Sequence, residues 1–224
     1  MERLNIPIFS GQGPTSINSR CVQDQVIISS ASPPGTLLLS SCFEAFHSEL
    51  SSLSEAELEM TGVSLVDFDR PSALLLVLPD KYLRNSVVSD TRLLLIQALI
   101  YLGWATGAVG TAQDAFSALL ERNRQNSTGI VGFSSGVISA CVVGTSATLL
   151  DFLSNAVSAF RVALWIGVRT QFSRGHALLA SGFQINDNCL WSVVLLGIGH
   201  HATEEAISRF CLQVSTLLWL IYIR

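Results

Sequence analysis

The chain has 224 residues, of which 49% are hydrophobic and 13% charged, and its formal net charge at pH 7 is −4. This composition excludes a disordered chain and is enough to bury the core of one domain, or of one domain with an added lobe. The acidic balance leaves no basic stripe to neutralise phosphates, so we predict that nucleic acid is not a partner.

The first half of the chain predicts strands and helices in alternation. Residues 5–9 form a short strand that ends in a glycine-rich loop, and a polar segment containing the sequence PPG follows. Residues 36–50 carry apolar positions at helical spacing, and LSEAELEM predicts a short helix capped by Ser54. The apolar run SALLLVL, residues 72–78, has the length of a buried strand.

The second half continues the alternation. Residues 92–105 and 112–123 predict two helices, TGIVGF predicts a buried strand, and residues 136–170 predict one long helix or two consecutive ones. The tail changes to a β-α-β pattern through CLWSVVLLG, ATEEAISRFCLQV and TLLWLIYIR, which is half of a small split sheet. Together these elements predict an α/β fold with a largely parallel central sheet.

Cysteine usage and the N-terminus indicate the compartment. The cysteines are widely spaced, odd in number and form no C-x-x-C pair, so we expect small core residues rather than disulfides or a metal site. They are Cys21, Cys42, Cys141, Cys189 and Cys211. The sequence MERLNIPIFSGQG has no long apolar region of a signal peptide, and we therefore predict a cytoplasmic protein.

A nearly uncharged run at residues 93–109 raises the question of a membrane span. Gln97, Thr106 and glycines interrupt this run, and the other apolar stretches are short or contain Ser, Thr and Gly. Helices that are hydrophobic on all sides also form protein cores. We predict a buried core helix and no membrane partner.

The sequence GFSSG places Ser134 between Gly132 and Gly136, after a predicted strand and before a predicted helix. In a G-x-S-x-G turn the serine hydroxyl is exposed on a strained backbone, and glycines allow strand and helix to approach closely. The first amides of the helix can then stabilise an oxyanion. The same residues also occur in a plain turn between a strand and a helix, so the motif alone leaves both interpretations open.

The sequence FSGQGP follows the first predicted strand and places backbone amides around Gln12 at the carboxyl end of the sheet. Gln12 could donate the second oxyanion amide, although a simple glycine-rich loop is the alternative. Both elements in one α/β chain resemble an acyltransferase of the malonyl-transferase type.

The resemblance extends to a narrower family through four segments in the same order, IPIFSGQGP, GFSSGVISACVVG, AVSAFRVALWIGVRT and LWSVVLLGIGHHATEEAISRF. Together they resemble the starter-unit acyl-carrier-protein transacylase domain of fungal non-reducing polyketide synthases. The resemblance implies Ser134 as the acyl-accepting nucleophile and the amides of Gln12 and Ser135 as the oxyanion hole. It implies acyl-CoA or a phosphopantetheine-linked thioester as substrate, an acyl carrier protein of a polyketide synthase as partner, and no bound cofactor or metal.

The resemblance also implies an architecture with two parts. Residues 1–186 would form a malonyl-transferase-like α/β domain with the nucleophile elbow, and residues 187–224 would form an incomplete ferredoxin-like lobe. The family most often carries cysteine at the elbow, and its catalytic histidine follows the completed lobe. We therefore expect a truncated form with impaired turnover and self-association through an exposed sheet edge.

Several other residues are candidates for roles in the site. His200 and His201 could supply the base, or could cap the helix that follows or be solvated. His47 is expected at the surface. His176 is expected in a loop and is also left open as a base. Arg161 could pair with a substrate carboxylate, or form a structural salt bridge. Carboxylates near the SALLLVL segment are expected to be solvated in loops, and these are Asp67, Asp69 and Asp80.

Two other function classes fit the same sequence. A serine hydrolase would combine Ser134 with Asp151 or Asp187 and then with His200 or His201, which keeps the chain order of that class. A chain without a working base would instead be a non-catalytic remnant that serves as an interaction module.

Overall fold

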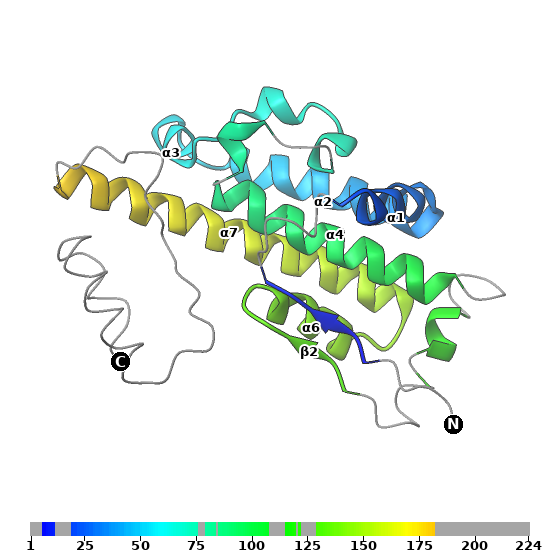
Figure 1. Cartoon of the computed structure of the whole chain (residues 1–224). Helices are drawn as coiled ribbons and strands as arrows, with labels where there is room; N and C mark the ends of the chain where they lie inside the picture. Colours follow the sequence, from blue (N-terminus) through cyan, green and yellow to red (C-terminus); the bar gives the residue numbers. More distant parts are fainter. Residues whose placement is uncertain are drawn as a thin grey trace, which may run out of the picture. The chain divides into compact units, whose positions relative to one another are not determined.

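The computed structural model describes residues 6–11, 19–75, 79–83, 85–107, 115–119, 121 and 129–181, with the backbone alone for residues 80 and 176–181. These residues are mostly helical and include a two-stranded parallel sheet (Figure 1). The chain divides into two compact units, Met1–Phe172 and Ser173–Arg224. The predicted boundary between residues 186 and 187 lies outside the described residues and stays a prediction.

The sheet consists of β1, Ile8–Phe9, and β2, Val131–Gly132. The strands are parallel, with Ile8 opposite Val131 and Phe9 opposite Gly132. Both strands fall within the predicted segments. They are far apart in the sequence, so their pairing places the loop after β1 beside the turn after β2.

Two consecutive helices occupy the segment after β1, α1 at Arg20–Ala31 and α2 at Pro33–Ser51, with a bend of 96° between them. The predicted helix at 36–50 is confirmed within α2, and the polar segment before it, for which the sequence pattern predicts no helix, is helical as well. The N–H groups of the first helical turn have no partner within the helix, so proline, which has no N–H, loses nothing there, and its fixed φ suits the turn. Pro33 and Pro34 therefore begin α2, after the cap residue Ser32.

The chain after α2 forms short helices. Helix α3, Glu55–Thr61, begins with the capping box of Ser54 and Glu57, as the predicted cap requires. Three 3-10 helices follow, η1 at Leu65–Phe68, η2 at Pro71–Leu74 and η3 at Asp80–Tyr82. The predicted strand at 72–78 is therefore wrong over residues 72–74, and residues 76–78 lie outside the described part.

The expectation that the nearby carboxylates are only solvated is wrong for Asp67. Its Oδ2 accepts hydrogen bonds from Lys81 Nζ at 2.5 Å and from the Tyr82 hydroxyl at 2.6 Å. These hydrogen bonds lower the pKa of Asp67. The ring of Tyr82 also packs on the buried ring of Phe68, with 5.2 Å between their centroids. This contact and the hydrogen bonds of Asp67 join η1 to η3.

The long helix α4, Ser86–Thr106, lies in the middle of the core and contacts α1, α2 and α6. Helix α6, Gly136–Thr145, follows β2, and α7, Leu149–Ser181, follows α6, so residues 136–170 form two helices. Residues 115–119 are helical as predicted. The rings of Tyr101, Phe116 and Phe152 pack together and bring α4, this segment and α7 into one core.

Two described helices, α4 and Leu149–Gly175 within α7, are long and apolar enough to cross a membrane, or three if α1 and α2 are counted as one bent span. In α4, however, 67% of the most apolar window is buried inside the protein. Burial against other helices explains an apolar surface on all sides of a core helix. The absence of a membrane partner stays a prediction.

The cysteines are only partly as expected. Cys42 is buried, and burial raises the pKa of its thiol to about 12. Cys21 and Cys141 are exposed free thiols rather than core residues. Cys189 and Cys211 lie outside the described residues.

One face of the sheet is apolar and exposed. Ile8 and Val131 are register partners, so their side chains share a face, and they are 65% and 37% exposed. Ile6 and Phe133, two residues along each strand, are 52% and 60% exposed. Parallel strands are usually covered on both faces. These four side chains form an exposed apolar patch on the sheet.

We expect the double variant Ile8→Thr, Val131→Thr to reduce self-association, because it removes apolar area while keeping β-branched residues in the strands. Sedimentation velocity over a range of protein concentrations measures the effect. Val66→Thr is the control, since Val66 is 84% exposed on η1, away from the sheet. An unchanged sedimentation profile in the double variant would exclude this face as a site of self-association.

Candidate active site

The site is built around Ser134, in the turn that joins β2 to α6. Its φ is 54°, the one positive φ found at a non-glycine residue of the described chain. The turn is closed by a 2.9 Å hydrogen bond from the Gly136 N–H to the Phe133 carbonyl. A left-handed backbone costs a side-chain-bearing residue about 1 kcal/mol or more. Ser134 is held in this conformation and is exposed.

The glycines on either side of Ser134 allow close packing of backbone on backbone. A Cβ on Gly132 would lie 2.6 Å from the Gly136 carbonyl oxygen and 2.6 Å from the Val137 Cα. A Cβ on Gly136 would lie 2.3 Å from the Phe9 carbonyl oxygen. Neither position can carry a side chain without displacing backbone. The first turn of α6 therefore rests directly on both strands.

The loop after β1 reaches the serine. A Cβ built on Gly11 would lie 2.6 Å from the Ser134 Cβ and 3.0 Å from its Oγ. Gly11 thus contacts the side chain of Ser134, although 123 positions separate them in the sequence. Gln12 follows directly and lies outside the described residues, so its role in an oxyanion hole stays a prediction.

Ser135 begins α6 as its N-cap residue, with a helical backbone. Its Oγ is buried and has no hydrogen-bond partner. The N–H groups of Gly136, Val137 and Ile138 donate within this turn, to the carbonyls of Phe133, Ser134 and Ser135. The helix dipole gives the start of α6 a partial positive charge, which lies next to Ser134 and has the sign that favours an oxyanion.

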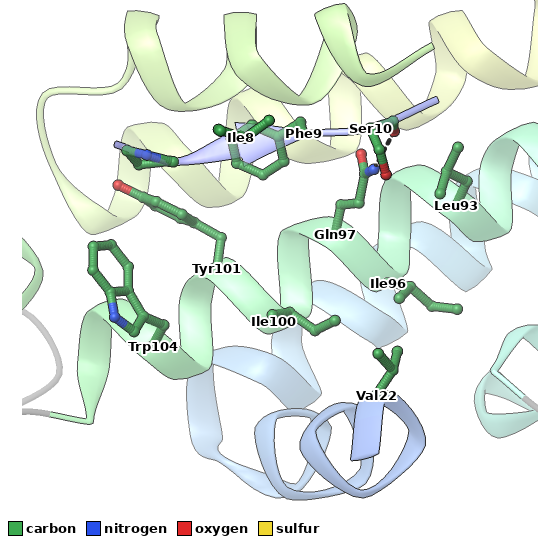
Figure 2. Close-up of a pocket in the computed structure, with 11 residues that line it drawn as sticks. Ile8, Phe9, Ser10, Val22, Leu93, Ile96, Gln97, Ile100, Tyr101 and Trp104 are labelled. Carbon is green, nitrogen blue, oxygen red and sulfur yellow. Dashed lines mark hydrogen bonds between the residues drawn. The ribbon is translucent and has the colours of Figure 1, made fainter. Parts of the chain in front are cut away.

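Gln97 and Ser139 are two polar residues of the site region that the sequence analysis did not identify as part of a site. Gln97 on α4 donates from Nε2 to the Ser10 carbonyl at 2.6 Å (Figure 2). The Ser139 hydroxyl on α6 donates to Gln97 Oε1, also at 2.6 Å. The sequence does contain one hint of this role, a carboxamide within an otherwise apolar helix, which also counts against a membrane span.

A pocket of about 300 Å³ lies between β1, α1 and α4, on the side of β1 that faces Gln97 (Figure 2). Its lining is mainly apolar and includes Val22, Ile96 and Trp104. Tyr101 also lines it, with a buried hydroxyl that has no hydrogen-bond partner, and burial raises the pKa of this tyrosine to about 12. The described residues contain no cluster of His, Cys, Asp or Glu that could hold a metal ion.

Arg161 is engaged in a structural contact. Its Nε lies 3.3 Å from Oε1 of Glu49 on α2, and the second oxygen of Glu49 accepts a 3.0 Å hydrogen bond from Trp165 Nε1. The contact joins α7 to α2. Of the two alternatives for Arg161, the structure contains the salt bridge.

The histidines are placed only in part. His47 is half-buried rather than at the surface, with Nε2 at 2.6 Å from the Phe68 carbonyl oxygen and the ring of Phe43 at 4.5 Å between centroids. Residue 176 continues helix α7, so the predicted loop around His176 is wrong. His200 and His201 lie outside the described residues, and their candidacy as the base stays a prediction.

Asp151, one candidate acid of a serine hydrolase, caps a helix. Its Oδ2 accepts from the Thr148 N–H at 3.0 Å, and its own N–H donates to the Thr148 hydroxyl at 3.1 Å. This reciprocal pair stabilises the start of α7. Asp187, the other candidate acid, lies outside the described residues.

A serine at positive φ between a parallel strand and a helix, with glycines on both sides and a glycine loop against its side chain, has the geometry of a nucleophile elbow. Enzymes that form an acyl ester on serine use this arrangement. The turn around Ser134 therefore has the geometry that is typical of enzymes that transfer acyl groups or hydrolyse esters.

The sequence matches the family described as "Starter unit:ACP transacylase in aflatoxin biosynthesis" over residues 24–222, and the chain belongs to this family. It is 43% identical over 210 residues to "Orsellinic acid synthase ArmB" of Armillaria ostoyae and 40% identical over 210 residues to "Orsellinic acid synthase armB" of Armillaria mellea. An "Orsellinic acid synthase" of Beauveria bassiana is 31% identical over 207 residues. The predicted resemblance is confirmed.

These alignments cover 91% to 92% of this chain and 9% of each relative, so the chain spans about a tenth of the length of these curated proteins. No solved structure matches the chain. The details of the acyltransferase architecture beyond the described helices and sheet therefore stay predictions.

Gly136→Ala should lower the free energy of unfolding by about 1–3 kcal/mol, because its Cβ would overlap the Phe9 carbonyl oxygen. Gly144→Ala, in the same helix, is the control, since a Cβ there meets nothing within 4 Å. A methyl group at that position should stabilise the helix by up to about 1 kcal/mol. Urea unfolding measures both. Equal stability of the two variants would contradict the close packing of α6 on β1.

Proposed function

We propose that this chain transfers a starter acyl group from a thioester to the phosphopantetheine thiol of an acyl carrier protein, through an ester on Ser134. The observation that carries the proposal is the strained, exposed Ser134 with Gly11 against its side chain. Membership of the transacylase family supports the class of reaction. The relatives named orsellinic acid synthases support a polyketide synthase as the setting.

The chemistry requires two transfers that balance. In the first, Ser134 Oγ attacks the thioester carbonyl, the C–S bond breaks, and the leaving thiolate takes up the proton that the serine hydroxyl gives to a base. In the second, the carrier thiol gives its proton to that base and attacks the ester, and the serine oxygen is protonated again. Serine ionises less readily than cysteine, so the reaction depends strongly on the base. His200 and His201 are the candidates.

The tetrahedral intermediate of each transfer carries a negative oxygen. The amides of Gln12 and Ser135 are the proposed donors, one following the β1 loop and one at the start of α6. Donors fixed before the reaction stabilise this charge without reorganisation, which accounts for a large part of the rate enhancement in such enzymes. The contact of Gly11 with Ser134 supports the placement of the first donor.

The remaining parts of the proposal follow from the same family. The substrate is acyl-CoA or a carrier-bound thioester with no resident cofactor, and the protein is cytoplasmic. A malonyl-transferase-like domain over residues 1–186 carries the elbow, and residues 187–224 belong to a ferredoxin-like lobe. The salt bridge of Arg161 with Glu49 is consistent with an uncharged starter group rather than one that bears a carboxylate.

Incubation with a panel of acyl-CoA thioesters should add the mass of one acyl group to the intact protein, because the ester on Ser134 accumulates when no carrier thiol is present. Ser134→Ala should abolish the adduct. Ser158→Ala is the control, since that exposed hydroxyl donates only to the Ser154 carbonyl of its own helix. The absence of an adduct in folded wild-type protein would contradict the proposed function and favour a non-catalytic interaction module.

The identity of the acyl acceptor distinguishes the proposed transacylase, which uses a carrier thiol, from a hydrolase, which uses water. With a purified acyl carrier protein, we expect acyl-carrier thioester to form faster than free acid. Rapid release of free acid from an ester or thioester without the carrier would instead indicate a serine hydrolase. The helix-capping contacts of Asp151 disfavour that alternative, because they already use both the carboxylate and the amide of that residue.

A further inference from the structure

A polar bridge links α4, the end of β1 and α6 next to the elbow, and it consists of Gln97, Ser10 and Ser139. Gln97 is half-buried on α4, and its carboxamide bonds at both ends, from Nε2 to the Ser10 carbonyl and from the Ser139 hydroxyl to Oε1, each at 2.6 Å. Figure 2 shows the Gln97 side chain reaching from α4 to the end of β1 at Ser10. The bridge joins three elements that are distant in the sequence.

The two ends of the bridge lie on the two segments that form the proposed oxyanion hole. Ser10 immediately precedes Gly11, which contacts Ser134. Ser139 lies in the first turns of α6, the helix that starts at Gly136 after Ser135. The relative position of these segments fixes how Gly11 and the start of α6 lie around Ser134. Gln97 is the side chain that holds both segments at once.

The chemistry of the bridge requires a group that donates and accepts. A carboxamide supplies an N–H donor for a backbone carbonyl and an oxygen acceptor for a hydroxyl. Ser139 is 4% exposed, so its hydroxyl would have no access to bulk water if Gln97 were apolar. An unpaired buried hydroxyl is costly, so the bond to Ser139 ties α4 to α6, while the exposed bond to the Ser10 carbonyl attaches the loop after β1 to α4.

We propose that Gln97 is a positioning residue for acyl transfer, which fixes the spacing between the loop after β1 and the start of α6. This inference rests on the proposed function of Ser134. Gln97 acts on the elbow through its hydrogen bonds to Ser10 and Ser139. A displacement of about 1 Å at a reacting centre can reduce a rate by about 100-fold.

Three variants separate the two ends of the bridge. Gln97→Met keeps the length of the side chain and removes both hydrogen bonds. Gln97→Glu keeps an acceptor for Ser139 and places a carboxylate against the Ser10 carbonyl. Ser139→Ala leaves the bond to Ser10 in place. Gln171→Met is the matched control, on α7 and also half-buried.

Single-turnover acylation is measured against thioester concentration, at a temperature where circular dichroism shows every variant to be folded. We expect the maximal rate constant to fall by about 10- to 100-fold in Gln97→Met and Gln97→Glu, with the half-saturating concentration unchanged. Ser139→Ala should lose less, about 3-fold, because the loop stays attached. Rates equal to wild type in folded Gln97→Met would overturn the positioning role.

Amide hydrogen exchange tests the bridge without catalysis. In Gln97→Met, peptides covering residues 6–11 and 131–139 should exchange at least about 10-fold faster, while peptides of α2 and α3 stay unchanged. Unchanged exchange at both segments would overturn the bridge whether or not the protein acylates. If wild type forms no acyl-enzyme but the exchange increases as expected, the proposed function and with it the positioning role fail, while the structural bridge stands.

Discussion

The backbone contact between the first turn of α6 and the two strands is the constraint on which the rest of the site depends. Gly136 lies so close to Phe9 that a methyl group would overlap a carbonyl oxygen, and Gly132 lies equally close to α6. This packing fixes the start of the helix directly above the sheet. The chain can reach that position from β2 only through a tight turn, and the turn places Ser134 at positive φ. Strain at the serine is thus a consequence of packing around it.

A second level of organisation comes from α4, which is apolar on nearly every side because helices and the sheet surround it. Gln97 lies within this helix and joins the loop after β1 to α6, next to the elbow. Its partner Ser139 is buried and donates its hydroxyl to Gln97, while its partner Ser10 is exposed. The glycine contacts and the hydrogen bonds of Gln97 thus hold the same small region around the turn.

The sequence predicted best where a local rule decided the structure. The capping box at Ser54, the helical spacing of residues 36–50 and the strand-turn-helix around Ser134 depend on neighbours within a few residues. Prediction from the sequence failed where the same residues can adopt two different local structures. Prolines 33 and 34 are typical of turns and also suit the first turn of a helix, and residues 72–74 of the apolar run suit a strand but belong to the 3-10 helix η2, which contacts η1 and α2. Local sequence alone does not choose between such alternatives.

The sequence by itself determined the family of this protein and the identity of the proposed nucleophile, because an ordered set of short motifs and a G-x-S-x-G turn are written in consecutive residues. Tertiary structure alone decided which distant residues meet. The contact of Gly11 with Ser134, the ion pair of Arg161 with Glu49 and the bridge through Gln97 each join segments separated by tens of residues or more. No local periodicity encodes such pairs, since they arise only when strands and helices pack into one core.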